Sequence, residues 1–274
     1  MFEEALQNVR NRAPLVHSIT NYVTVNDCAN IILACGGSPI MADDVGEVCD
    51  ITSICSSLVI NMGTLNERTM RSMITAGKKA NELGHPVVFD PVGAGASNMR
   101  NEAAERLLKE VKFSVIRGNI SEIKFLATGS SNTQGVDAAV ADAITPENID
   151  SVVAFAKSLS AATGSVIAIT GATDIVANAQ KAYVIRNGHP MMSRVTGTGC
   201  MLTAVIGSFI GANPDSLLEA AAGAVAAMGL CGELAWQKLD QVDGGTGTYR
   251  MLLIDAMSKL TVPMLKEGGK IEDR

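Results

Sequence analysis

The feature of this sequence that most constrains its fold is a repeated alternation of short apolar runs with segments of helical periodicity. The runs expected to form strands are 58–61, 86–90, 113–117 and 165–170, and the segments expected to form helices are 66–83, 101–111, 121–127 and 148–162. Strands that are joined through helices by short connections form a parallel sheet with helices on both faces. We therefore predict an α/β fold, in which Asn66 and Gly84 cap the first of these helices.

The C-terminal third is rich in alanine and glycine and is expected to be mostly helical. We predict helices over 200–211 and 214–236. Asn213 and Pro214 suit the start of the second helix, because asparagine caps helices and proline fits their first position. Gly207 and Gly211 suit close packing of the first helix, and the run 181–186 suits an edge strand.

The pentapeptide Thr196-Gly197-Thr198-Gly199-Cys200 opens the first of these helices. A glycine turn before a helix presents unpaired backbone N–H groups at the positive end of the helix dipole, where anions such as phosphate bind. Cys200 falls in the first helical turn, a position that lowers the pKa of a thiol. The pattern favours phosphoryl transfer, and a tight turn with a small buried cysteine is the alternative.

Polar residues end the predicted strands, and these residues are Asn61, Asp90, Arg117 and Thr170. Since the carboxyl ends of parallel strands line the edge of a sheet where ligands bind, we expect these side chains to lie together. Asn119 and Glu122 follow Arg117 at a strand-to-helix corner. Carboxylate oxygens suit magnesium and a guanidinium suits phosphate, so the joint pattern predicts a site for a polyphosphate and its magnesium.

Composition excludes several classes of partner. The net charge of −6 and the 4% aromatic content argue against nucleic acid and against an anionic membrane surface. The six cysteines form no C-x-x-C pair, the first residues do not resemble a signal peptide, and the longest uncharged apolar stretch, 201–212, is too short to span a bilayer. We expect one cytoplasmic domain over residues 1–274. The sequence contains no P-loop and no G-x-S-x-G motif, so any nucleotide is bound in another way.

A series of short segments extends over nearly the whole chain in a fixed order. The segments are HSITNYV (17–23), 26–30, GSPIMA (37–42), VINMGTL (59–65), DPVGAG (90–95), IRGN (116–119), ITG (169–171), GH (188–189) and VTGTGC (195–200). In these segments the chain resembles the hydroxyethylthiazole kinase family. The resemblance implies a ribokinase-like single domain, with a central, mostly parallel sheet flanked by helices on both faces.

The resemblance also implies a reaction and a set of site residues. It implies ATP-dependent phosphorylation of the primary hydroxyl of 4-methyl-5-(2-hydroxyethyl)thiazole in thiamine salvage, with magnesium, by a homotrimer whose active sites lie at subunit interfaces. The residues matching positions around the thiazole are Asn21, Val23, Met41, Gly63 and Gly197. Arg117, Asn119 and Thr170 match positions that contact ATP, Asp90 and Glu122 match positions near magnesium, and Gly199 belongs to the turn whose N–H groups meet the phosphoryl group.

Cys200 is the predicted catalytic residue, and it is expected to orient the alcohol or accept its proton. Sugar kinases of this fold have an aspartate at this position, so the cysteine favours the thiazole-kinase branch. Two features depart from the family pattern. Residues 245–249 read Gly-Thr-Gly-Thr-Tyr where the family often has Gly-Pro-Gly-[Ser/Thr]-Phe, and Asp43 and Asp44 add charge near the expected thiazole pocket.

Three alternatives remain open. The first is another kinase of this fold that acts on a pyrimidine or a vitamin alcohol. The second is an ATP-dependent dehydratase for hydrated nicotinamide cofactor, and the third is a non-catalytic protein that binds a thiazole or a nucleotide. Cys200 and the segment from Asn21 to Met41 argue against the first two alternatives. The combination of Asp90, Arg117, Glu122 and Cys200 argues against the third.

Overall fold

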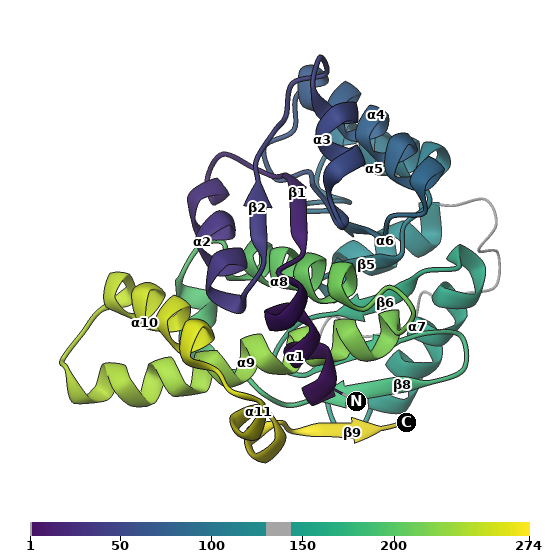
Figure 1. Cartoon of the computed structure of the whole chain (residues 1–274). Coiled ribbons are helices and arrows are strands. Elements are labelled where there is room, and N and C mark those ends of the chain that lie inside the picture. Colours follow the sequence, from purple (N-terminus) through teal and green to yellow (C-terminus); the bar gives the residue numbers. More distant parts are fainter. Residues whose placement is uncertain (1, 130–143) are drawn as a thin grey trace.

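A nine-stranded sheet forms the centre of the computed structural model, which describes residues 2–129 and 144–274 (Figure 1). Its strands are β1 (Leu15–Ile19), β2 (Ser38–Ile40), β3 (Ser57–Asn61), β4 (Val87–Asp90), β5 (Val115–Gly118), β6 (Val166–Ile169), β7 (Asp174–Ala177), β8 (Ala182–Ile185) and β9 (Ile271–Asp273). Across the sheet the order is β2-β1-β3-β4-β5-β6-β7-β8-β9. The strands from β2 to β6 are parallel, and β7, β8 and β9 pair antiparallel, which confirms a mostly parallel sheet.

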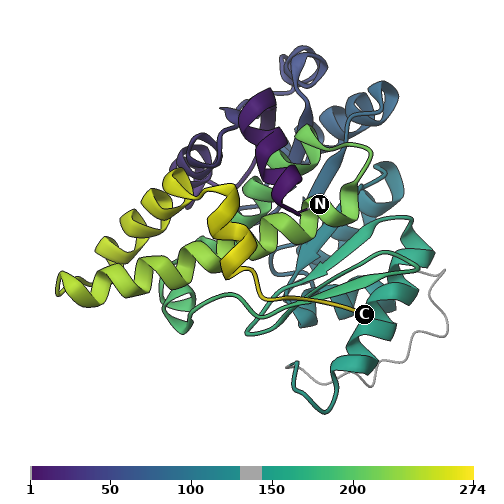
Figure 2. The ribbon, with the colours of Figure 1, turned by 60° about the horizontal axis from the view of Figure 1, so that its bottom comes forward.

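Helices cover both faces of this sheet (Figures 1 and 2). One layer contains α3 (Val48–Ile54), α4 (Glu67–Leu83), α5 (Asn98–Glu110), α6 (Ile120–Gly129) and α7 (Ile149–Thr163). The other contains α1 (Phe2–Arg12), α2 (Val25–Cys35), α8 (Thr198–Ala212), α9 (Leu217–Gln241), α10 (Thr246–Lys259) and α11 (Val262–Gly268), with the 3-10 helix η1 (Pro190–Arg194) before α8. Strand residues alternate between the two cores: Leu58 and Ile60 face the first layer, and Val59 faces the second.

The predicted caps and the close helix packing are confirmed. The Asn66 side chain accepts a hydrogen bond of 3.0 Å from the Thr69 N–H at the start of α4, and Gly84 ends this helix in the left-handed conformation. A Cβ added to Gly207 would lie 2.5 Å from Val59 Cγ2. The absence of a side chain at Gly207 therefore lets α8 approach the sheet at the strand that carries Asn61.

Two predictions about the C-terminal half are wrong. The run 181–186 is not an edge strand, because β8 pairs with β7 on one side and with the short β9 on the other. Asn213 does not begin a helix. It ends α8, where its Nδ2 donates 2.8 Å to the Phe209 carbonyl and 3.2 Å to the Ala5 carbonyl, and α9 begins at Leu217.

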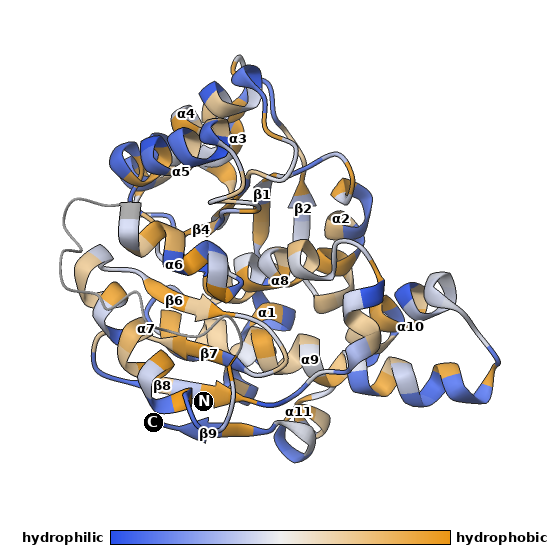
Figure 3. Cartoon of the chain, turned by 180° about the vertical axis from the view of Figure 1, so that it is seen from behind, coloured by the Kyte–Doolittle hydropathy of each residue, from blue (hydrophilic) through white to orange (hydrophobic). Residues whose placement is uncertain are grey.

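The longest helix, α9, is also strongly apolar. Among the described residues it is the one helix long and apolar enough to cross a membrane by length and composition, and 78% of its most apolar window is buried inside the structure. It packs against α1, α8 and α10 and against the antiparallel strands. Figure 3 shows hydrophobic residues on the strands and hydrophilic residues on α5 and at the C-terminal end of α9. The apolar side chains of α9 therefore form part of the core between the sheet and the second layer of helices.

Candidate active site

The polar residues that end the parallel strands lie together at one edge of the sheet, as the sequence predicted. Asn61 ends β3 and Asp90 ends β4, and the two are paired in register. Arg117 lies in the adjacent β5, and Thr170 directly follows β6. Arg117 Nη2 donates a hydrogen bond of 2.6 Å to Thr170 Oγ1. A cation and a hydroxyl are therefore held together beside the Asp90 carboxyl.

Asp90 is a fully buried acid. Its Oδ2 accepts hydrogen bonds of 2.7 Å from Asn61 Nδ2 and from Thr203 Oγ1, and Arg117 Nη1 lies 3.6 Å away. Its Oδ1 has no hydrogen-bond partner among the described residues. Burial, helped by the nearby charge of Glu122, raises the pKa of Asp90 to about 6, although Arg117 opposes this change. The site thus contains two carboxyl groups that repel each other.

Glu122 and Asn119 form a reciprocal cap at the start of α6. Asn119 Oδ1 accepts a hydrogen bond of 2.9 Å from the Glu122 N–H, and Glu122 Oε2 accepts one of 2.8 Å from the Asn119 N–H. Glu122 Oε1 accepts a further bond of 2.8 Å from the Gly93 N–H in the loop after β4. Asn119 therefore fixes the position of Glu122, and the contact of Asn119 with ATP stays a prediction.

The carboxyl groups fit a magnesium ion that takes most of its ligands from water and phosphate. Within residues 2–129 and 144–274, no group of three His, Cys, Asp or Glu side chains is arranged to hold a metal ion. Mg²⁺ commonly binds through one or two carboxylates together with waters and substrate phosphates. The unpaired, buried Oδ1 of Asp90 and the second lone pairs of the Glu122 oxygens are suited to that arrangement.

Cys200 lies in the first turn of α8 and faces this edge. Its Sγ accepts hydrogen bonds from Asn21 Nδ2 at 3.2 Å and from Asn61 Nδ2 at 3.3 Å. Asn21 Nδ2 also donates 3.0 Å to Asn61 Oδ1, and its own Oδ1 accepts a bond of 3.1 Å from Thr24 Oγ1. The thiol is thus fixed by two amide groups, one of which also binds Asp90.

The expectation that the helix N-terminus lowers the pKa of Cys200 is wrong. Burial of the sulfur raises this pKa, and the neighbouring Asp90 carboxyl raises it further, against weaker hydrogen bonds that lower it. The effect of the Asp90 charge cannot be read from the pentapeptide, because Asp90 lies on a distant strand. The neutral thiol is therefore the favoured form in this environment.

Three predicted glycines lie where a side chain would collide with the site. Gly197 precedes α8 with φ of +88°, and a Cβ there would contact Thr24 Cγ2. A Cβ on Gly199 would lie 2.7 Å from Arg117 Nη1, and one on Gly63 would lie 2.9 Å from the Asn21 side chain. The absence of side chains keeps the start of α8 close to the Arg117 guanidinium.

Arg100 is a residue that the sequence analysis missed. Its Nη1 donates hydrogen bonds of 2.8 Å to the Met62 carbonyl and 2.6 Å to the Val92 carbonyl, and its Nη2 donates one of 2.7 Å to the Gly63 carbonyl. One guanidinium therefore joins the loop after β3 to the loop after β4. No sequence signal marks this role, because the partners are backbone atoms.

Two predicted thiazole residues lie on less enclosed segments. Val23 is 57% exposed just before α2, and Met41 is partly buried after β2. The added charge of Asp43 is paired, since Arg68 donates two hydrogen bonds of 3.1 and 2.9 Å to its carboxylate. Asp44 Oδ1 accepts 2.8 Å from a backbone N–H. Substrate roles for Val23 and Met41 stay predictions.

A cavity of about 600 Å³ opens beside Arg117, Thr170 and Gly199. Its other lining residues are Gly171, Ala172, Asp174, Asn187, Gly188, His189, Pro190, Met192, Ser193, Thr198, Leu202, Val225, Met228 and Gly229. Asp174 is buried, and burial raises its pKa to about 7. Three of the four residues predicted for ATP, Arg117, Thr170 and Gly199, thus line one cavity, and Asn119 is not among its lining residues.

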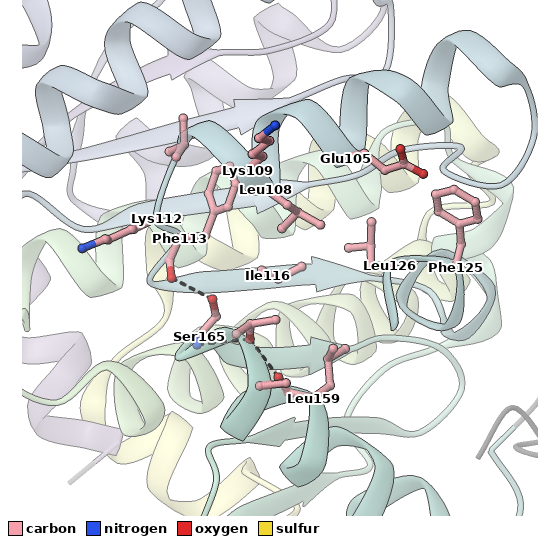
Figure 4. Close-up of a pocket in the computed structure, with 13 residues that line it drawn as sticks. Glu105, Leu108, Lys109, Lys112, Phe113, Ile116, Phe125, Leu126, Leu159 and Ser165 are labelled. Carbon is pink, nitrogen blue, oxygen red and sulfur yellow. Dashed lines mark hydrogen bonds between the residues drawn. The ribbon is translucent and has the colours of Figure 1, made fainter. Parts of the chain in front are cut away.

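A second cavity, of about 540 Å³, lies among α5, β5, α6 and α7 (Figure 4). The labelled side chains include Leu108, Phe113 and Leu126, with Glu105 and Lys109 at the rim. None of the predicted site residues lines it, so it is separate from the candidate active site.

Solved structures show the class of fold. The chain is similar to a ribokinase-like superfamily protein from Enterococcus faecalis V583, with 14% identity, a TM-score of 0.61 and 95% of each chain covered. A hydroxyethylthiazole kinase from Pyrococcus horikoshii OT3 is 32% identical, with a TM-score of 0.87 over 100% of this chain and 98% of that chain. The protein therefore has the ribokinase-like fold, as expected.

Sequence comparison then identifies the family. The model of the hydroxyethylthiazole kinase family matches residues 6–263. Hydroxyethylthiazole kinases from Clostridium acetobutylicum and Clostridium beijerinckii are 59% and 55% identical, over 100% and 98% of this chain and 97% and 95% of theirs. The chain belongs to the hydroxyethylthiazole kinase family, and it is a phosphotransferase.

Proposed function

We propose that this protein transfers the γ-phosphoryl group of ATP to the primary hydroxyl of 4-methyl-5-(2-hydroxyethyl)thiazole. One observation carries the proposal. The cavity beside Arg117 is adjacent to the cluster of Cys200, Asn21 and Asp90, because its lining residue Gly199 directly precedes Cys200 and its lining residue Arg117 lies 3.6 Å from Asp90 Oδ2. A nucleotide in the cavity and an alcohol at the cluster would then meet at this helix terminus.

The chain's own groups supply an anion site. The turn from Gly197 to Cys200 presents backbone N–H groups at the start of α8, and Arg117 lies against Gly199. The buried Nε of Arg117 has no partner among the described residues, so it is available to a phosphate oxygen. Phosphoryl transfer depends mainly on positioning and on stabilisation of charge, which fixed donors provide.

Magnesium, when bound, would neutralise charge on the phosphate oxygens. Asp90 and Glu122 are the residues proposed to hold it. Thr203 and Asn61 fix the orientation of the Asp90 carboxyl through its Oδ2, which leaves Oδ1 directed away from these two partners. The Gly93 N–H donates to Glu122 Oε1 and the Asn119 N–H donates to Glu122 Oε2, and these two bonds fix the orientation of the Glu122 carboxylate.

Cys200 is proposed to position the alcohol. Its raised pKa disfavours a thiolate, and a loose transition state requires little removal of the proton before the phosphoryl group moves. Asn21, Gly63 and Gly197 border the same place, because Gly63 packs on Asn21 and Gly197 packs on Thr24 beside it. We propose that Val23 and Met41 complete the thiazole pocket.

The substrate assignment is tested by ADP release with four acceptors: the thiazole alcohol, pyridoxal, hydroxymethylpyrimidine and hydrated NADH. We expect release with the thiazole alcohol and not with the other three. Arg117→Met should abolish release, and Arg106→Met, which changes an exposed arginine on α5, is the matched control. Release with another acceptor alone would refute the proposed substrate.

We also propose a cytoplasmic homotrimer in which Val23 and its surroundings contact a neighbouring subunit. Tyr22, Val23 and Leu33 are large apolar side chains that are 77%, 57% and 58% exposed. Sedimentation should give one species near three times the chain mass of 28.6 kDa. Val23→Glu should dissociate it and lower activity, and a fully active monomer would contradict shared sites.

A further inference from the structure

The cavity beside Arg117 combines polar lining residues with an apolar patch. Arg117, Thr170 and Gly199 form part of the polar lining. Leu202, Val225 and Met228 form the apolar patch, from α8 and α9. A nucleotide whose phosphates bind at Arg117 would extend its base along this apolar patch.

His189 is the aromatic residue among those that line this cavity. It lines the cavity, and its imidazole stacks on the indole of Trp236 with 4.3 Å between ring centroids and 15° between ring planes. His189 Nδ1 accepts a hydrogen bond of 3.2 Å from the Met191 N–H, so the neutral ring carries its proton on Nε2. Trp236 comes from α9 and is itself absent from the cavity lining. It therefore supports the imidazole from behind.

We propose that the His189–Trp236 stack positions the base of the nucleotide. The inference rests on the proposed function, since it assumes that the cavity holds the phosphoryl donor. Parallel aromatic surfaces attract one another through offset stacking, and every nucleobase presents such a surface. His189 touches the base, and Trp236 is a positioning residue that keeps the imidazole plane fixed. The proton on Nε2 adds a donor for a ring nitrogen of the base.

A purely structural role for His189 is separable from this one. His189 caps η1 through its Nδ1, and asparagine can accept the same hydrogen bond from the Met191 N–H. His189→Asn therefore keeps the cap and removes the aromatic face. Trp236→Ala removes the support, Trp236→Phe keeps an aromatic ring, and Gln237→Ala changes the exposed neighbour of Trp236 as a matched control.

The experiment combines steady-state kinetics with the fluorescence of Trp236, the only tryptophan of the chain. We expect His189→Asn and Trp236→Ala to raise the KM for ATP about 3- to 10-fold, the range of one stacking contact, with KM for the thiazole alcohol unchanged. Trp236→Phe and Gln237→Ala should keep the wild-type KM for ATP, and melting temperatures should stay equal. ADP added to the wild-type protein should change the tryptophan emission in a saturable way.

The two proposals fail in different ways. An unchanged KM for ATP in His189→Asn, or calorimetric binding of ADP without any change in emission, would overturn the role of the stack and leave the kinase reaction intact. Absence of ADP release with the thiazole alcohol would refute the proposed reaction. The titration with ADP alone would then still show whether the stack borders a nucleotide site.

Discussion

Gly197→Ala is the change that tests the start of α8 most directly. Gly197 has φ of +88°, where a residue with a Cβ is strained, and the new methyl would contact Thr24 Cγ2. The left-handed conformation costs about 1–2 kcal/mol for such a residue, and overpacking typically costs about 1–3 kcal/mol more. For a chain of this size, each kcal/mol lowers the melting temperature by about 2–4 °C. Displacement of the turn by about 1 Å should lower kcat/KM on the order of 10²-fold.

Thr24→Ser separates the cost of overpacking from the cost of the positive φ, because it deletes Cγ2 and keeps the Oγ1 that donates to Asn21 Oδ1. In the double variant the overpacking should be relieved, so about 1–3 kcal/mol of stability returns while the cost of the positive φ remains. Urea unfolding of the four proteins in the cycle measures this coupling, and ADP release measures activity. Gly247→Ala, where a Cβ would meet open space, is the control.

This reasoning would be refuted if the changes in the free energy of unfolding caused by Gly197→Ala and Thr24→Ser were strictly additive in the double variant. If Thr24→Ser does not rescue Gly197→Ala, then contact with Cγ2 is not the cause of the loss of stability. If Gly197→Ala keeps full activity despite the strain, then the N–H groups at the start of α8 do not position the phosphoryl group.

Three further predictions concern other parts of the site. Cys200→Ala should lower kcat about 10²-fold with little change in KM for the thiazole alcohol, because the reacting hydroxyl loses the group that positions it. Cys200→Asp should retain activity because the amides that donate to Sγ can donate to a carboxylate. A large rise in KM with kcat unchanged would contradict the proposed role. Arg100→Lys should lower the free energy of unfolding by about 2–3 kcal/mol and raise KM for the alcohol, because lysine cannot bridge the three carbonyls that Arg100 binds. As a control, Arg106→Lys on the exposed face of α5 should change the free energy of unfolding by less than about 1 kcal/mol. Burial raises the pKa of Asp174 to about 7, so its carboxyl keeps a proton in the folded state that the unfolded state releases above the ordinary pKa of 3.8. The free energy of unfolding should therefore fall between about pH 4 and pH 7, by up to about 4 kcal/mol. Urea unfolding at several pH values should show a flatter pH dependence for Asp174→Asn, and equal slopes in the two proteins would exclude this explanation.

The central part of the fold could be predicted from sequence because its strands are continuous apolar runs. The predicted range 58–61 differs from β3 by one residue, and 148–162 differs from α7 by one residue at each end. β1 was not predicted as a strand, because His17 and Ser18 interrupt its apolar pattern although both are buried. β9 is three residues long and is identified as a strand only by its pairing with β8.

The candidate site was predictable where a role follows from position in a parallel sheet. Asn61 and Asp90 end neighbouring strands and Arg117 lies one residue before the end of the next strand, so the rule for strand ends brings them together without knowledge of their contacts. Arg100 could not be found in this way, because its partners are main-chain carbonyls of two loops. The direction of the change in the pKa of Cys200 was also missed, since it depends on burial and on a carboxyl from another strand.

The edge of the sheet where Asn61, Asp90, Arg117 and Cys200 meet has a consequence for how the molecule acquires activity. Each of these side chains comes from a different strand or helix, and the segments between them are long. Parallel pairing of distant segments is slow compared with local helix formation, because the chain must close large loops first. During refolding, recovery of helical circular dichroism should therefore precede recovery of catalysis. Recovery of catalysis therefore reports on the correct pairing of β3, β4 and β5 and on the docking of α8 beside them.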